Sequence, residues 1–503
     1  MNTVWKLILI ASSAALVALS GCGGGGGSDS LAGIGGTGKI ASGTITGFGS
    51  IFVNGIEYNT DSASIAVDDS SASESDLRIG MVVTVTGTVS DTTGNASSVV
   101  YDDEVEGPAS GLATLPVGAT TRSFRVLGTD IVIDATGTVF DNSTPGFAFD
   151  TIANDDVVEV SGFFDALGVL RATYIEKTGV LNPGTTEVEL KGTVSGASGA
   201  GGTATFGESF TVNGITVDIG DVSSTDLSDV PGSVVSDGMF VEVKGLWVNA
   251  NSVAASRIEE EDTTLGDDGD DVSVEGLVSG FTGDLSLFFV NGQAVNATTA
   301  SFEPGTLQLA NDLKVEAEGT INSSGVLVAE KIESRSGDVE VQAVVTSKTV
   351  TNSAFNEGSL TLLLVANTQQ LTVQTNSRTR FEDKTEVVDA LRLSDISSGD
   401  YLELRGLIDD GGAVVATEVR RDDASGEDVV LQGPVSSSIT DTSITILGVT
   451  FGTQVGTTEF EGLLDQPLTS STFYGSLSPG TLVKLKDDNV PGDGIVDEAS
   501  LED

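Results

Sequence analysis

The stretch Ile51-Phe52-Val53-Asn54-Gly55-Ile56-Glu57-Tyr58 places an Asn-Gly pair between two short β-prone runs. Both central residues of a two-residue hairpin turn need positive φ, which Asn and Gly adopt most readily. The octapeptide therefore predicts a β-hairpin that turns at Asn54 and Gly55. The same pattern recurs at 210–217 and 288–295, and looser copies lie at 124–133, 444–451 and around 366–367.

A strand with two-residue alternation follows each of these hairpins and ends in glycine or lysine. These strands lie at 82–87, 157–162, 240–245, 313–319, 401–406 and 482–486. Alternation puts one face of a strand in a core and leaves the other face in water. Six repeats of roughly 65–90 residues therefore account for most of the chain.

The repeats predict an all-β fold, a tandem array of about six small antiparallel β-barrels of the OB-like kind, with a small sandwich as the alternative. Closure into a barrel removes the exposed edges of so short a sheet. Five glycines end the alternating strands, where a barrel wall is expected to bend: Gly87, Gly162, Gly245, Gly319 and Gly406.

The expected organisation is a row of separate domains joined by linkers. The predicted boundaries are 1–21 for a signal peptide, 22–38 for a Gly-rich linker, and 39–104, 105–178, 187–262, 272–335, 338–424 and 428–503 for the six repeats. The linkers are expected near 179–186, 260–271 and 334–338.

The start of the chain resembles the export signal of a bacterial lipoprotein. Lys6 precedes an apolar run at 7–19, which is too short for a membrane-spanning helix. Leu19-Ser20-Gly21-Cys22 is similar to the lipobox of that class. The resemblance implies cleavage between Gly21 and Cys22, and a covalent diacylglycerol and N-acyl lipid on Cys22.

The same resemblance suggests a location for the body of the protein. Gly23 follows the cysteine in place of the aspartate that favours inner-membrane retention among lipoproteins. We therefore expect a lipid anchor in the outer membrane of a Gram-negative bacterium. The sequence leaves open whether the periplasmic or the cell-surface face carries the domains.

The composition argues against several classes of function. The formal net charge is −51, from 23 basic and 74 acidic residues, so nucleic acid is not an expected partner. The absence of histidine removes Ser–His and Cys–His nucleophiles and imidazole metal ligands. The single cysteine leaves no thiol for a disulfide or a zinc site. We therefore expect no catalytic residues.

Three motifs of the first repeats resemble a known family. They are Gly-Phe-Gly-Ser-Ile-Phe-Val-Asn-Gly at 47–55, Leu77-Arg78-Ile79-Gly80-Met81-Val82-Val83, and Tyr101-Asp102-Asp103-Glu104-Val105-Glu106-Gly107-Pro108. They resemble bacterial lipoproteins built from repeats of domain of unknown function 5666. The match is close for the first repeat, fair for the second to fourth, and weak for the fifth and sixth. The resemblance implies an exported array of β domains and brings no activity or site residues.

Acidic residues gather at four places, which lie at 102–104, 155–156, 259–262 and 267–271. Calcium takes about six to eight oxygen ligands, and carboxylates on turns can supply them. The stretch 259–271 is the best calcium candidate, with Asp267, Asp268, Asp270 and Asp271 as ligands. A solvated linker in a very acidic protein is the other interpretation.

These observations predict a non-enzymatic lipoprotein whose tandem β domains bind or support a partner from the envelope or the extracellular space. One alternative is a calcium-binding spacer or adhesin that is stiffened at its acidic interdomain junctions. A carboxylate-dependent hydrolase is the other alternative.

Mass spectrometry of the mature amino terminus should find Cys22 as the first residue, carrying diacylglycerol and an N-linked acyl chain. Because the thioether needs the sulfur atom, Cys22→Ser should leave the leader attached and the protein without lipid. Ser28→Ala, which lies beyond the signal, should be processed normally. A bare Cys22 in the wild-type protein would contradict the anchor.

Overall fold

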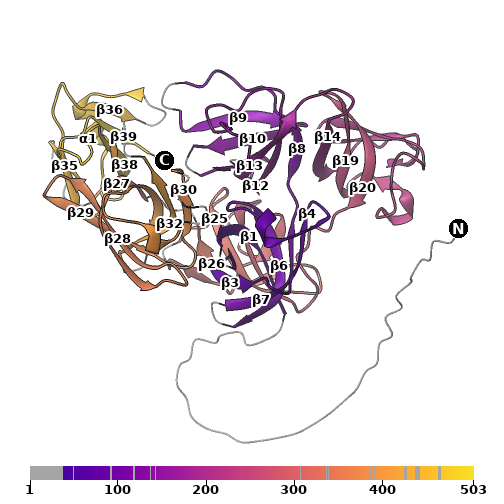
Figure 1. Cartoon of the computed structure of the whole chain (residues 1–503), viewed down its shortest axis with the longest axis horizontal. Coiled ribbons are helices and arrows are strands. Elements are labelled where there is room, and N and C mark those ends of the chain that lie inside the picture. The colour runs from indigo at the N-terminus through magenta and orange to yellow at the C-terminus, as the bar shows by residue number, and fades with distance from the viewer. Residues whose placement is uncertain are drawn as a thin grey trace, which may run out of the picture.

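The computed structural model describes residues 38–502 except 49, 91–92, 117–118, 136, 142, 306, 336, 338, 386–387, 389–390, 410, 424–426, 437–441 and 463–465. Gly21 and Cys22, the predicted cleavage and lipidation residues, lie outside this range. The described residues are mostly β-strand with one short α-helix, which confirms the all-β prediction (Figure 1). None of their helices is both long and apolar enough to cross a membrane.

The strands fall into six consecutive units. Unit 1 contains β1 (Gly38–Gly47), β2 (Ile51–Val53), β3 (Ile56–Asn59), β4 (Ser64–Val67), β5 (Ser70–Ala72), η1 (Glu74–Asp76), β6 (Val82–Ser90) and β7 (Thr93–Tyr101). Unit 2 contains β8 (Val105–Pro108), β9 (Thr121–Val126), β10 (Thr129–Asp134), β11 (Val139–Phe140), β12 (Asp156–Phe164) and β13 (Leu170–Val180). Unit 3 contains β14 (Glu187–Thr193), β15 (Thr203–Ala204), β16 (Ser209–Val212), β17 (Ile215–Ile219), η2 (Pro231–Ser233), β18 (Val235–Ser236), β19 (Phe240–Asn249) and β20 (Ser252–Glu260).

The second half of the chain repeats this arrangement. Unit 4 contains β21 (Asp271–Ser279), β22 (Phe288–Val290), β23 (Gln293–Asn296), β24 (Ser301–Glu303), β25 (Lys314–Ile321) and β26 (Leu327–Ser334). Unit 5 contains β27 (Val339–Asn352), β28 (Glu357–Val365), β29 (Gln369–Thr375), β30 (Arg380–Asp383), η3 (Leu393–Asp395), β31 (Tyr401–Ile408) and β32 (Val414–Asp422). Unit 6 contains β33 (Val429–Pro434), β34 (Ser443–Ile446), β35 (Val449–Gly452), β36 (Glu459–Gly462), β37 (Gln466–Pro467), α1 (Ser470–Ser476), β38 (Leu482–Asp487) and β39 (Glu498–Leu501).

The strand order within a unit is plainest in unit 1. β1 pairs with β2, β2 with β3, β3 with β7, β7 with β6 and β6 with β1, so the ladder returns to its first strand. Units 4 and 5 follow the same order. Units 2, 3 and 6 complete it through single bridges, as between Ser195 and Thr211. This order gives an OB-like fold.

The predicted hairpin turns are confirmed. Asn54 and Gly55 have φ of 51° and 77°, as a turn with two left-handed residues requires. Asn213 and Asn291, with φ of 49° and 45°, begin the equivalent turns in units 3 and 4. In the looser copy of unit 2, Leu127 takes the same conformation with φ of 44°.

Each unit contains one or two parallel strand pairs, which differs from the expectation of purely antiparallel barrels. In unit 1, β3 and β7 run in the same direction with Glu57 opposite Thr93. The reason is geometric, because a closed ring of five strands cannot alternate direction throughout. At least one pair of neighbouring strands must be parallel.

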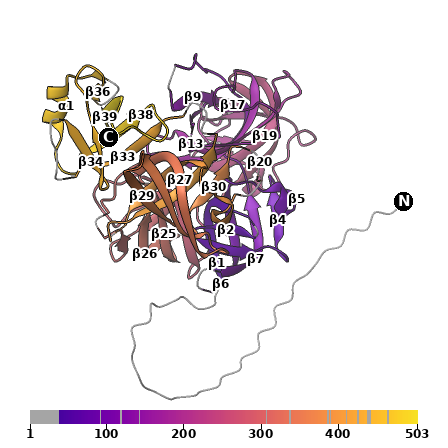
Figure 2. The ribbon, with the colours of Figure 1, turned by 60° about the vertical axis from the view of Figure 1, so that its left-hand side comes forward.

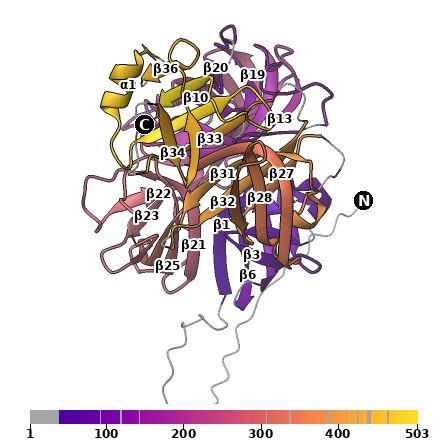
Figure 3. The same ribbon diagram turned by 90° about the vertical axis from the view of Figure 1, so that its left-hand side faces the viewer.

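The units do not form the expected row of separate beads, because their first strands pair with one another. β8 pairs with β14 (Figure 1), β27 with β33 (Figure 2), and β1 with β21 (Figure 3). Units 2 and 3, 5 and 6, and 1 and 4 are therefore joined by continuous β-ladders. The apolar cores of units 2 and 3 merge, as do those of units 5 and 6.

The glycines at the ends of the alternating strands lie at bends in the wall, as predicted. The register of the ladder shifts between Glu318 and Gly319, and it shifts at the equivalent glycine of units 1, 2, 3 and 5. A Cβ atom on Gly319 would lie 2.1 Å from the carbonyl oxygen of Val328 on the neighbouring strand. Only glycine allows the two backbones to approach this closely.

Gly319→Ala should destabilise unit 4 by about 1–3 kcal/mol, because the added methyl group forces β25 and β26 apart. Hydrogen–deuterium exchange of the amides in these two strands should become faster. Gly179→Ala is the matched control, since no atom lies within 4 Å of a Cβ at that position. Equal exchange in the two variants would contradict this account of the bend.

Candidate functional site

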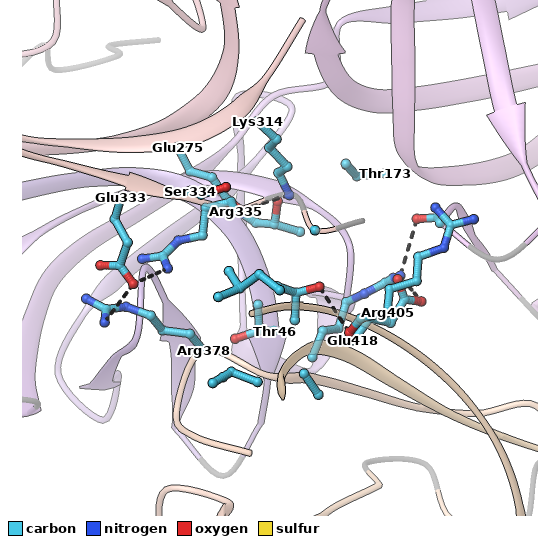
Figure 4. Close-up of a pocket in the computed structure, with 18 of the residues that line it drawn as sticks. Thr46, Thr173, Glu275, Lys314, Glu333, Ser334, Arg335, Arg378, Arg405 and Glu418 are labelled. Carbon is cyan, nitrogen blue, oxygen red and sulfur yellow. Dashed lines mark hydrogen bonds and ion pairs between the residues drawn. The ribbon is translucent and has the colours of Figure 1, made fainter. Parts of the chain in front are cut away.

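A pocket of about 680 Å³ lies where the three pairs of units meet (Figure 4). Its lining comes from units 1, 2, 4 and 5, and includes Thr46, Phe163, Lys314 and Arg405. Ligand pockets of roughly 300–1,000 Å³ commonly form at such interfaces between domains. This pocket is therefore the candidate site.

Positive charge is concentrated in this lining. Acidic residues outnumber basic ones by 74 to 23 in the whole chain, whereas six basic and six acidic residues line the pocket. The basic residues are Arg171, Lys314, Arg335, Arg378, Arg380 and Arg405. A negatively charged ligand would meet a balanced lining here instead of the strong net negative charge of the chain.

Unit 4 contributes one wall through Lys314 and Glu275. The Lys314 Nζ lies 2.8 Å from Oε1 of Glu275, and 5.1 Å from the centre of the Phe163 ring. The other oxygen of Glu275 accepts the backbone N–H of Thr44 at 2.8 Å. Burial alone would raise the pKa of Glu275, but Lys314 and these hydrogen bonds hold it below its ordinary value. The ion pair is therefore expected to stay charged at neutral pH.

A second wall is built around Glu333. Arg335 Nη1 lies 2.7 Å from Oε1 of this carboxylate and Arg378 Nη1 lies 3.3 Å from it. Burial would raise the pKa of Glu333, but the two guanidinium groups lower it to about 2. Because Arg378 belongs to unit 5 and Glu333 to unit 4, the cluster also joins two pairs of units.

Unit 5 contributes a third wall that faces unit 2. Arg380 forms an ion pair with Glu418, and its Nη2 also donates to the carbonyl oxygen of Gly137 at 3.3 Å. Arg405 Nη2 lies 3.1 Å from Oδ1 of Asp134. Burial would raise the pKa of Glu418, but Arg380 and Arg420 hold it below its ordinary value.

Two guanidinium nitrogens of this lining are buried without a hydrogen-bond partner among the described residues. They are Nε of Arg378 and Nη1 of Arg380. The nearby carboxylate oxygens of Glu316 and Glu382 are 3.9 and 3.8 Å away, which is too far for a hydrogen bond. Guanidinium groups bind carboxylates and phosphates through such N–H donors. The pocket can therefore hold an anionic group.

The predicted calcium ligands lie elsewhere, on the turn before β21. Asp267 and Asp268 are exposed, and Oδ2 of Asp270 accepts the backbone N–H of Asp267 at 2.8 Å. Asp271 begins β21 and accepts a hydrogen bond from Thr320 at 3.4 Å. In the described part of the chain, the carboxylates close enough to share one cation form two other groups. These are Asp68, Asp103 and Glu159, and Asp69, Glu242 and Glu259.

The sequence did not indicate the pocket, because its residues come from four units with no shared motif. The sequence contained one signal of the pocket. Because basic residues are scarce in this acidic chain, a place where they gather stands out. The Arg378-Thr379-Arg380 stretch is a local concentration of positive charge, and both arginines line the pocket.

Comparison with known proteins identifies a family that covers most of the chain. The pattern described as domain of unknown function (DUF5666) matches residues 37–99, 116–176, 191–259, 275–333, 342–420 and 432–487. No curated protein matches the sequence.

Two solved structures are similar to parts of the chain at low scores. A deletion mutant of the single-stranded DNA binding protein from Thermus aquaticus is 12% identical, with a TM-score of 0.16, over 33% of this chain and 91% of that one. The structure described as drosophila Unr CSD456 is 12% identical, with a TM-score of 0.12, over 46% of this chain and 97% of that one. At these scores neither similarity carries an argument. The six matches above show that the chain belongs to the family of domain of unknown function DUF5666 and carries this domain six times.

Proposed function

We propose that this chain is a non-enzymatic binding protein, anchored to the outer membrane through Cys22, and that its central pocket takes a small anionic ligand. The ligand class is one that carries a carboxylate or phosphate group on a skeleton small enough for about 680 Å³. The observation that carries the proposal is a pair of buried guanidinium nitrogens, on Arg378 and Arg380, that have no hydrogen-bond partner among the described residues.

The surroundings of these donors support an anion over a neutral ligand. Lys314, Arg335 and Arg405 add positive charge to the lining, although each already has a carboxylate partner. Leaving buried N–H donors unpaired costs free energy, which a ligand oxygen would recover. Apolar groups such as Phe163 and Leu277 offer surface for the remainder of the ligand.

The proposed anchor fits a protein that acts outside the cytoplasm. A lipid on Cys22 would keep the six units at an envelope face, where they meet small molecules before those reach the cell interior.

Thermal unfolding of the full chain with three related probes tests the proposal. Glucose, glucuronate and glucose 6-phosphate share one skeleton and differ in charge. At millimolar concentration the two acids should raise the melting temperature far more than glucose does, because a guanidinium group binds a carboxylate or phosphate more strongly than a neutral hydroxyl.

Arg378→Met should abolish the shift given by the acids. This variant leaves no buried carboxylate alone, because Glu333 keeps Arg335 as a partner. Arg125→Met is the matched control, since Arg125 is exposed and pairs with Asp130 away from the pocket. A shift with glucose as large as that with the acids, or a full shift in Arg378→Met, would contradict an anion site.

A further inference from the structure

Three carboxylates from different segments converge where unit 1 meets unit 2. Asp68 lies on the turn between β4 and β5, Asp103 lies on the connection from β7 to β8, and Glu159 lies in β12. One carboxylate oxygen from each residue lies within 4.8 Å of the others. Units 1 and 2 share no β-ladder within the described residues. The three side chains therefore lie at an interface that is not stabilised by strand pairing.

Asp103 is the most deeply buried of the three carboxylates. Its side chain is 1% exposed, and its Oδ1 has no hydrogen-bond partner among the described residues. The Asp103 backbone N–H donates to Oδ1 of Asp68 at 3.4 Å, which holds the two acids together. A buried carboxylate oxygen without a donor is costly unless a cation or a proton reaches it.

The neighbouring group of acids shows how basic side chains compensate such a cluster in this protein. Asp69, Glu242 and Glu259 also converge, but Lys244 Nζ lies 3.0 Å from both Asp69 and Glu242. Arg257 adds a contact to Asp69 at 2.9 Å. Basic side chains therefore already neutralise this second group.

The first group has no such partner. Within the described residues, Asp68, Asp103 and Glu159 form no ion pair, and Lys191, the basic residue whose charge reaches Asp103, pairs with Glu189 and Glu242. No basic side chain of the described residues therefore lies within ion-pair distance of these three carboxylates, in contrast to the second group.

We propose that Asp68, Asp103 and Glu159 bind a calcium ion that fastens unit 1 to unit 2. Calcium suits a set of carboxylate oxygens on a turn, a connection and a strand, because its coordination tolerates irregular geometry and added water. Asp68 and Glu159 are half-buried, so the ion reaches the group from solvent. This site is independent of the anion pocket and uses none of its residues.

Thermal unfolding of the full chain in detergent, with calcium chloride or with EDTA at matched ionic strength, tests the site. Calcium at about 10 mM exceeds the dissociation constants typical of extracellular modules. It should raise the melting temperature of the wild type by several degrees. Asp103→Asn should lose this shift, yet melt no lower than the wild type in EDTA, because the substitution removes an uncompensated buried acid. Asp267→Asn/Asp268→Asn, which changes two exposed acids, should keep the full shift.

Terbium emission provides a second readout. Its displacement by calcium is measured on the wild-type protein, so it does not depend on whether a variant folds. The Tyr101 hydroxyl donates to Oε1 of Glu159 at 2.7 Å, so terbium at this site should be sensitised by the phenol ring. Calcium should displace the emission, and Glu159→Gln should abolish it. The proposal is overturned if the wild type melts equally in calcium and EDTA. It is equally overturned if Asp103→Asn keeps the full shift, or if calcium displaces no terbium.

Discussion

The architecture depends on one incompletely paired strand edge that every unit carries. In unit 1, β1 uses one edge for β6, whereas its other edge pairs with β2 only at Ile45 and Gly47. Residues 39–42 would leave backbone donors and acceptors unpaired on that second edge, and they pair instead with 271–274 of β21. Backbone groups in a core need such partners. The pairing of first strands therefore gives each unit a completed sheet and fixes which units lie together.

Side chains then select the register at these junctions. Asn54 of the hairpin turn donates to the carbonyl oxygen of Ser42 at 3.1 Å and to Oγ of Ser273 at 2.8 Å. Asn213 does the same between units 3 and 2, with Lys191 O at 3.0 Å and Thr129 Oγ1 at 3.2 Å. The asparagine that makes the turn thus also binds the junction. Basic residues connect one pair of units to another. Arg420 Nη1 of unit 5, for example, donates to the carbonyl oxygen of Ala135 in unit 2 at 2.8 Å.

Local features of the fold could be predicted from the sequence because short-range chemistry decides them. The Asn54-Gly55 turn and the bend at Gly319 each follow from the conformation that one or two residues adopt. The partner of each first strand could not be predicted, since all six first strands offer similar free edges and only tertiary packing distinguishes them. The pocket was missed for the same reason. Arg378 of unit 5 and Lys314 of unit 4 line one pocket only because tertiary packing brings their units together.

The one-to-one pairing of first strands has a consequence for how such chains can change in length. In sequence order, the pair formed by units 2 and 3 lies between units 1 and 4, which pair with each other. Units 5 and 6 form the third pair. Adding or deleting a single repeat would leave one unit whose first strand has no partner. The unpaired edge of that strand could then pair with another molecule. Adding two repeats at a time leaves no first strand unpaired. Even numbers of repeats therefore favour a monomer, and odd numbers favour self-association.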